Sequence, residues 1–138
     1  MRSVIGGAYN GKRNFVEQWL RQIEAQQIHI FEGEIPPSDF TKDEYVVIGN
    51  FEKIVMNYPE LQEDEIAEMV MTKLNQLDEQ TNLICICTDI GRGIVPLKKE
   101  DRKLRDTCGR LYQQLFQKSE KVIRIWYGIP QLLKGGRW

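Results

Sequence analysis

The chain opens with a short apolar segment that runs straight into a glycine-rich turn and then into a helical pattern. Val4 and Ile5 precede Gly6 and Gly7, and the helical pattern begins near Lys12. In a strand, glycine turn and helix arranged in this order, backbone N–H groups, the helix dipole and a lysine can all attract phosphate oxygens. The spacing GxxxxGK over residues 6–12 fits a phosphate-binding loop, so the feature predicts an α/β fold with a phosphate site at its first turn.

The loop departs from the usual pattern at its last position. Arg13 stands where the motif has Ser or Thr, whose hydroxyl ordinarily holds Mg²⁺. The alternative is that the glycines only make a tight turn, but the position after a strand and at a helix start favours phosphate binding. The residues expected to contact phosphate are Gly6, Gly7, Ala8, Asn10, Gly11, Lys12 and Arg13.

Length and composition narrow the classes of protein. A chain of 138 residues suits one domain, residues 1–138, and a net charge of −1 argues against nucleic acid or a membrane surface as partner. Cys85 and Cys87 share one face of a predicted strand and cannot readily pair, which favours free thiols in a reducing cytosol. With one histidine and no CxxC, we expect no metal site built from these ligands.

Helical spacing and short apolar runs predict the rest of the fold. Helical spacing indicates helices over 11–25, 59–79 and 98–118, while 51–58 reads as a short helix or an extended continuation. With the first strand, apolar runs at 28–31, 45–48, 83–87 and 122–126 give about five strands, and residues 134–138 are expected to form a loose tail. Strands alternating with helices indicate a mostly parallel sheet with helices on both faces.

Polar residues at the ends of the predicted strands are candidates for chemistry, since ligands of open α/β sheets lie beyond the carboxyl ends of strands. Asp89 follows the 83–87 strand and is the best candidate carboxylate for a metal-bound water or a substrate hydroxyl; a turn aspartate is the equal alternative. Gly91 and Gly93 follow in the same loop. The 45–48 strand ends at Gly49 without a carboxylate, and His29 reads as an ordinary strand side chain.

Four segments together resemble the bifunctional adenosylcobinamide kinase/adenosylcobinamide-phosphate guanylyltransferase family of cobalamin biosynthesis. They are GGAYNGKR (6–13), TDIGRGIVP (88–96), the pattern around Arg105 and Asp106 in the 98–118 helix, and the ending that starts at Gly128. The resemblance implies a P-loop NTPase-like three-layer sandwich, ATP or GTP as ligand with or without Mg²⁺, cobinamide or another corrinoid as acceptor, and a homo-oligomer such as a trimer.

The departures from that family fall at its chemistry. Arg13 replaces the loop hydroxyl, Gly49 aligns with the family's strand-end aspartate, and Asp89 stands for its glutamate. The segment EGEIPPSDF lacks the histidine that family members guanylylate, so guanylyl transfer is not expected.

Three hypotheses remain open from the sequence. The first is a kinase that depends on Lys12 and Asp89, and the second is a non-catalytic regulator or partner protein that binds a nucleotide or a corrinoid. In the third, Arg13 fills the pocket and the loop binds nothing. The residues leave open whether the chain is an enzyme.

Overall fold

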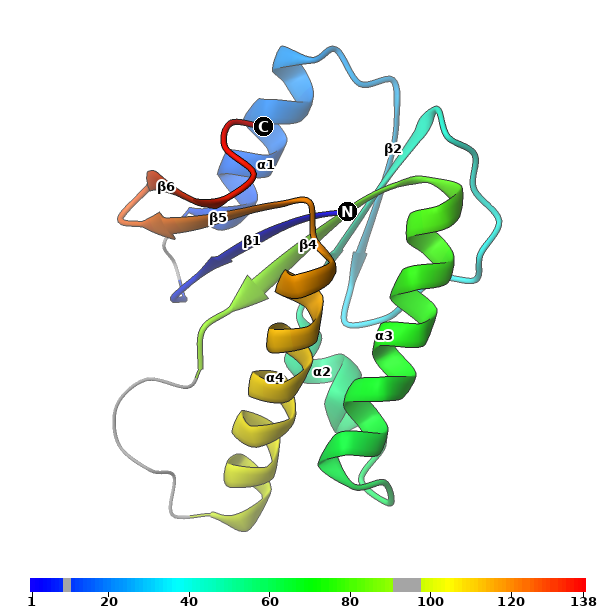
Figure 1. Ribbon diagram of the computed structural model, residues 1–138, viewed down its shortest axis with the longest axis vertical. Helices are drawn as coiled ribbons and strands as arrows, with labels where there is room; N and C mark the ends of the chain where they lie inside the picture. The colour runs from blue at the N-terminus through cyan, green and yellow to red at the C-terminus, as the bar shows by residue number, and fades with distance from the viewer. Residues whose placement is uncertain (9–10, 91–97) are drawn as a thin grey trace.

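The computed structural model describes residues 1–8, 11–90 and 98–138, and its elements alternate as an α/β chain (Figure 1). In order they are β1 (Arg2–Gly6), α1 (Lys12–Gln22), β2 (Gln27–Glu32), β3 (Glu44–Gly49), α2 (Phe51–Met56), α3 (Glu63–Gln80), β4 (Asn82–Thr88), α4 (Lys99–Lys118), β5 (Lys121–Trp126) and β6 (Ile129–Lys134). The apolar runs of the sequence therefore correspond to strands β1 to β5, and the prediction of an α/β fold is confirmed.

The strands form a six-stranded sheet in the order β2-β3-β4-β1-β5-β6. All neighbours are parallel except the β5–β6 pair, which is antiparallel. Strand β1 lies between β4 and β5, with Gly6 opposite Thr88 on one side and Ile125 on the other. The carboxyl ends of β1, β3 and β4 consequently meet at one edge of the sheet, where the glycine-rich turn also lies.

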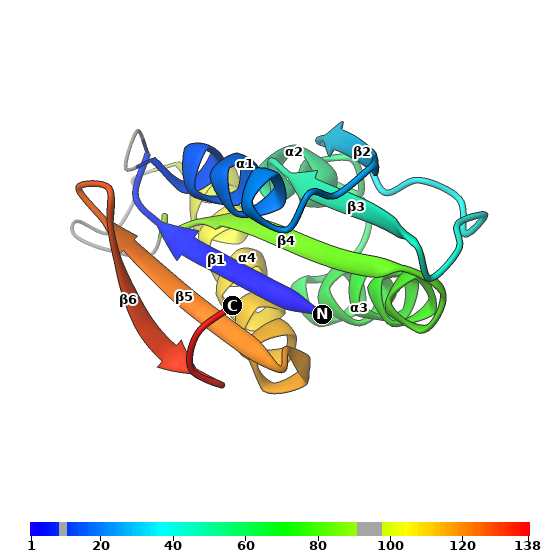
Figure 2. The same ribbon diagram turned by 90° about the horizontal axis from the view of Figure 1, so that it is seen from above.

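Helices cover both faces of the sheet (Figure 2). On one face α1 packs Val16 and Leu20 against strand residues such as Val4 and Ile84. On the other face α2, α3 and α4 pack against the alternate strand side chains, such as Cys85. Burial on both faces explains why the central strands are nearly continuous apolar runs rather than alternating patterns.

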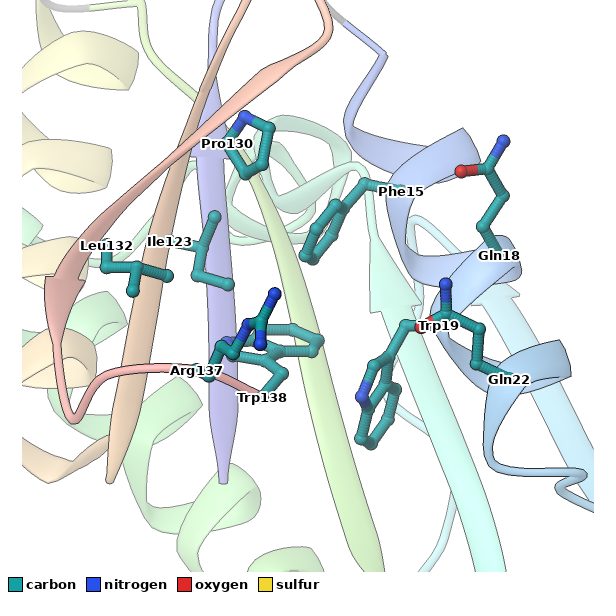
Figure 3. A pocket seen from close by; sticks show the side chains of 9 residues that line it. All are labelled: Phe15, Gln18, Trp19, Gln22, Ile123, Pro130, Leu132, Arg137 and Trp138. Carbon is teal, nitrogen blue, oxygen red and sulfur yellow. The ribbon is translucent and has the colours of Figure 1, made fainter.

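The carboxyl-terminal segment differs from the prediction in two ways. Residues 129–134 form a sixth strand at the sheet edge, which the sequence pattern did not indicate because every residue of β6 is exposed and Pro130 lies within it. The expectation of a loose tail is wrong: the Trp138 ring lies 5.4 Å from Phe15 and 5.2 Å from Trp19, centroid to centroid. Figure 3 shows these rings around a cavity between α1 and the edge strands.

The helices differ from expectation mainly at their ends. Residues 51–58, which the sequence left undecided, contain the short helix α2. Helix α3 begins at Glu63 rather than near Pro59, because Gln62 and Glu65 form a reciprocal capping box in which the Gln62 backbone N–H donates to the Glu65 carboxylate at 3.0 Å. Within the described ranges, no helix is both long and apolar enough to cross a membrane.

Candidate functional site

The glycine turn after β1 brings the chain into close contact with the neighbouring strand. A Cβ added to Gly6 would lie 2.6 Å from the carbonyl oxygen of Ile125, so a side chain does not fit without a shift of backbone. Gly11 caps α1 with φ of 85°, in the left-handed region that glycine adopts without strain. Of the predicted phosphate contacts, Asn10 lies outside the described residues.

Lys12, the first residue of α1, has its ammonium group held at this turn. The side chain is buried, with only 8% of the residue exposed. Its Nζ donates a hydrogen bond to the carbonyl oxygen of Gly7 at 2.7 Å. Burial lowers the pKa of Lys12 from its ordinary value, and the negative fields of Glu52 and Cys87 oppose that shift. A partly desolvated cation at a helix start attracts an anion more strongly than an exposed lysine would.

A cavity of about 380 Å³ opens beside Lys12, and we call it the Lys12 cleft. Its walls come from the amino ends of α1 and α2 and from the carboxyl ends of β2, β3 and β4. The lining residues are Gly11, Lys12, Arg13, Asn14, Glu32, Gly49, Asn50, Glu52, Ile86 and Thr88. The predicted loop residues 11–13 therefore share one cavity with the ends of the central strands, as an α/β ligand site requires.

Arg13 lies at the rim of this cleft and is paired there with carboxylates. Its guanidinium makes an ion pair with Glu32 and a second one with Glu17 at 3.3 Å. About half of the Arg13 side chain remains exposed to solvent. The guanidinium is thus paired with carboxylates of the protein while Arg13 also lines the cleft.

Glu52 is a functional candidate that the sequence analysis missed. Asn50 caps α2, its side-chain oxygen accepting a hydrogen bond from the backbone N–H of Lys53 at 3.3 Å, and this places Glu52 in the first helical turn beside the cleft. Its Oε1 is buried and has no hydrogen-bond partner among the described residues. Such an unpaired polar atom costs about 1–3 kcal/mol, a cost that a bound ligand can remove.

The signal that could have revealed Glu52 is its distance from the strand end. It follows Gly49 by three residues, and one capped helical turn is enough to bring it back over the end of β3.

Asp89 lines a different cavity from Lys12. Thr88 is the last residue of β4, and Asp89 follows it directly. Thr88 lines the Lys12 cleft, whereas Asp89 lines a second cavity of about 450 Å³. The residues of this second cavity are Ile5, Gly6, Gly7, Asp89, Phe116, Arg124, Trp126, Gln131 and Leu133.

The glycine turn lies between these two cavities. Gly6 and Gly7 line the Asp89 cavity, while residues 11–13 line the Lys12 cleft. The backbone N–H of Asp89 donates to the carbonyl oxygen of Gly6 at 2.9 Å, which ties the two strand ends together. The predicted catalytic pair is therefore brought to one turn but not into one cavity, and the predicted contacts Gly91 and Gly93 lie outside the described residues.

The single histidine of the sequence lies away from the Lys12 cleft, as predicted for a strand side chain. The Nε2 of His29 is 3.3 Å from Glu44 Oε1, and its ring lies 5.1 Å from Phe40. Neither His29 nor those two partners is among the lining residues of the cleft.

The other titratable groups of the core include three cysteines. Cys85, Cys87 and Cys108 are free and buried, and burial raises the pKa of Cys85 and of Cys108 to about 12. In the part of the chain that the structure describes, no three His, Cys, Asp or Glu side chains gather in a way that could hold a metal ion.

The fold is that of an α/β protein with a mostly parallel sheet and a lysine-bearing glycine turn at the carboxyl end of β1, which is consistent with a P-loop-like fold. A family model described as cobinamide kinase/cobinamide phosphate guanyltransferase matches residues 38–133, and the chain belongs to that family. A search of curated proteins gives no significant match.

The family match supports a cobinamide kinase- or guanylyltransferase-like function in cobalamin biosynthesis at the level of the family. It begins at residue 38, so the glycine turn, α1 and β2 lie outside the matched segment. Any binding role for the turn must therefore rest on its own geometry.

Proposed function

We propose that the protein binds the phosphates of a nucleoside triphosphate in the Lys12 cleft and acts as a kinase on the alcohol of a cobinamide-type acceptor. The observation that carries the proposal is the buried Lys12 ammonium, fixed at the glycine turn by its hydrogen bond to Gly7. Phosphoryl transfer depends mainly on positioning and on neutralising phosphate charge, both of which a fixed cation at a helix start can provide.

Of the two family activities, phosphoryl transfer fits this chain better than guanylyl transfer. Transfer of GMP through a guanylylated histidine, which the family resemblance implies, needs an imidazole at the site. His29 is the single histidine of the sequence and contacts Glu44 and Phe40 instead. Transfer of the γ-phosphoryl group directly to an acceptor alcohol requires no covalent protein intermediate.

Asp89 keeps a place in the proposal as a contact for the acceptor. Its cavity meets the phosphate-binding turn at Gly6 and Gly7, and it also contains the aromatic rings of Phe116 and Trp126. An acceptor held in that cavity would approach the phosphates across the glycine turn. In this arrangement Asp89 orients the acceptor, while Lys12 neutralises the phosphate charge.

The test is equilibrium binding of ATP and of GTP, measured by calorimetry with and without Mg²⁺. Lys12→Ala removes the ammonium, and Lys118→Ala, an exposed lysine on α4, serves as the matched control. We expect Lys12→Ala to weaken nucleotide binding at least tenfold, about 1.4 kcal/mol, and the control to bind as the wild type does. Equal binding by Lys12→Ala and the wild type would contradict the proposal.

Turnover of a cobinamide acceptor separates the kinase from its alternative. Phosphorylated product whose formation depends on Lys12 supports a kinase. Tight binding without product would instead indicate a nucleotide- or corrinoid-binding regulator or partner protein. A homo-oligomer such as a trimer and a location in the cytosol also belong to the proposal, the latter because the three cysteines are free thiols.

A further inference from the structure

The Lys12 cleft contains a cation and a carboxylate that are not paired with each other. Lys12 donates its hydrogen bond to the carbonyl oxygen of Gly7. Glu52 lines the same cleft, and its buried Oε1 has no partner among the described residues. A ligand that offers negative charge to Lys12 and a cation to Glu52 would satisfy both groups.

We propose that Glu52 is the carboxylate that supports a divalent cation on the triphosphate bound in the Lys12 cleft, with the Thr88 hydroxyl as a second oxygen donor. This inference rests on the proposed nucleotide binding and deepens it. Lys12 would hold the triphosphate oxygens, and Glu52 would hold the cation that neutralises them.

The charges of the cleft favour this arrangement over a metal-free triphosphate. A triphosphate alone would place several negative charges beside an unpaired carboxylate, which repels them. Glu32, the other carboxylate of the cleft, is already paired with Arg13 at the rim. Glu52 is therefore the carboxylate of the cleft that a cation can still neutralise.

The donor atoms also match what Mg²⁺ requires. Magnesium in nucleotide sites keeps several waters and is held by one or two carboxylates together with substrate phosphates, so a dedicated cluster of three acidic ligands is not needed. The chain lacks a loop hydroxyl at Arg13 and a carboxylate at Gly49. Glu52 on α2 and Thr88 on β4 bring the same two kinds of oxygen atom to the cleft from other elements.

The experiment compares nucleotide affinity in Mg²⁺ with affinity in EDTA, by calorimetry on ATP and GTP. For the wild type we expect Mg²⁺ to raise the affinity at least tenfold. Glu52→Gln keeps the shape of the side chain and should lose this gain, while its metal-free affinity stays equal or rises because a repelling charge has gone. Glu79→Gln, the same change at an exposed glutamate of α3 outside the cleft, should keep the gain.

Two results would overturn the inference in distinguishable ways. A Glu52→Gln protein that retains the full Mg²⁺ gain would refute the role of Glu52 but leave nucleotide binding intact. Absence of nucleotide binding by the wild type, with or without Mg²⁺, would refute the proposed function and this inference with it.

A measurement on the unchanged side chain keeps the inference testable even if Glu52→Gln does not fold. Mn²⁺ replaces Mg²⁺ in the nucleotide complex of protein labelled with ¹³C-glutamate, in the Glu32→Gln background. Electron–nuclear double resonance should then show a ¹³C coupling from a carboxylate bound directly to the metal. A spectrum without that coupling would overturn the proposal.

Discussion

The close approach of β1 to β5 at Gly6 gives a prediction that can be worked through from the structure. In Gly6→Ala, the added methyl group would lie 2.6 Å from the Ile125 carbonyl oxygen and 3.3 Å from the Cγ and Cδ atoms of Lys12. The lysine stem can move aside, but the carbonyl belongs to the backbone of β5. The substitution must therefore push apart two paired strands at the carboxyl edge of the sheet.

Overpacking of this kind costs about 1–3 kcal/mol in free energy of unfolding. Gly109→Ala is the matched control, because a Cβ there meets no heavy atom within 4 Å and Gly109 lies inside helix α4. Alanine in a helix interior is favoured over glycine by roughly 0.5–1 kcal/mol, so the control should be more stable than the wild type. The same chemical change is thus expected to have opposite signs at the two positions.

Urea unfolding followed by circular dichroism measures both variants. For Gly6→Ala we expect a lower midpoint with an unchanged slope, since the amount of surface exposed on unfolding stays the same. A Gly6→Ala midpoint equal to or above that of the wild type would refute the reasoning. It would mean that the two strands do not approach each other in solution as they do in the structure.

Two further predictions concern the tail and the acid stability of the fold. Trp138→Ala removes edge contacts with Phe15 and Trp19, at about 0.5–1.5 kcal/mol for each aromatic pair, so its urea midpoint should fall; an unchanged midpoint would show that the tail does not pack. The Thr41 backbone N–H donates a hydrogen bond to the Glu44 carboxylate and, together with His29, lowers the pKa of Glu44 below its ordinary value of 4.5. The ionised carboxylate therefore stabilises the fold above pH 4.5, and this stabilisation is lost as the pH falls through the lowered pKa. As the pH falls below 4.5, Glu44→Gln should therefore lose less free energy of unfolding than the wild type does. Equal losses in acid unfolding curves would contradict this.

Much of the fold could be predicted because its central strands, such as β3 and β4, are largely buried. Continuous apolar runs such as 83–87 identify central parallel strands whatever their neighbours are. Strand β6 could not be found this way, because an edge strand with all six residues exposed has neither a buried run nor an alternating pattern. The packing of Trp138 depends on contacts with α1, more than a hundred residues away in the sequence.

The parts of the candidate site that are close together in the sequence could be predicted, and the parts that the strand order brings together could not. The glycine turn and Lys12 form one continuous segment, so their spacing was enough to predict their proximity. Glu52 joins them only because β3 lies beside β4 and β4 beside β1. Asp89 and Lys12 are separated at the end of β4, because Thr88 lines the cleft of Lys12 whereas the next residue, Asp89, lines the other cavity.

Helix α1 contributes both to the proposed binding site and to the packing of one face of the sheet. It carries Lys12 at its first residue, and it is the helix that, within the described ranges, covers the face formed by Val4 and Ile84. Local opening of α1 would therefore dismantle the proposed phosphate site and uncover that face in the same event. A ligand present at 100 times its dissociation constant would make such opening costlier by about 2.7 kcal/mol, and backbone amides of α1 should exchange with deuterium about a hundredfold more slowly.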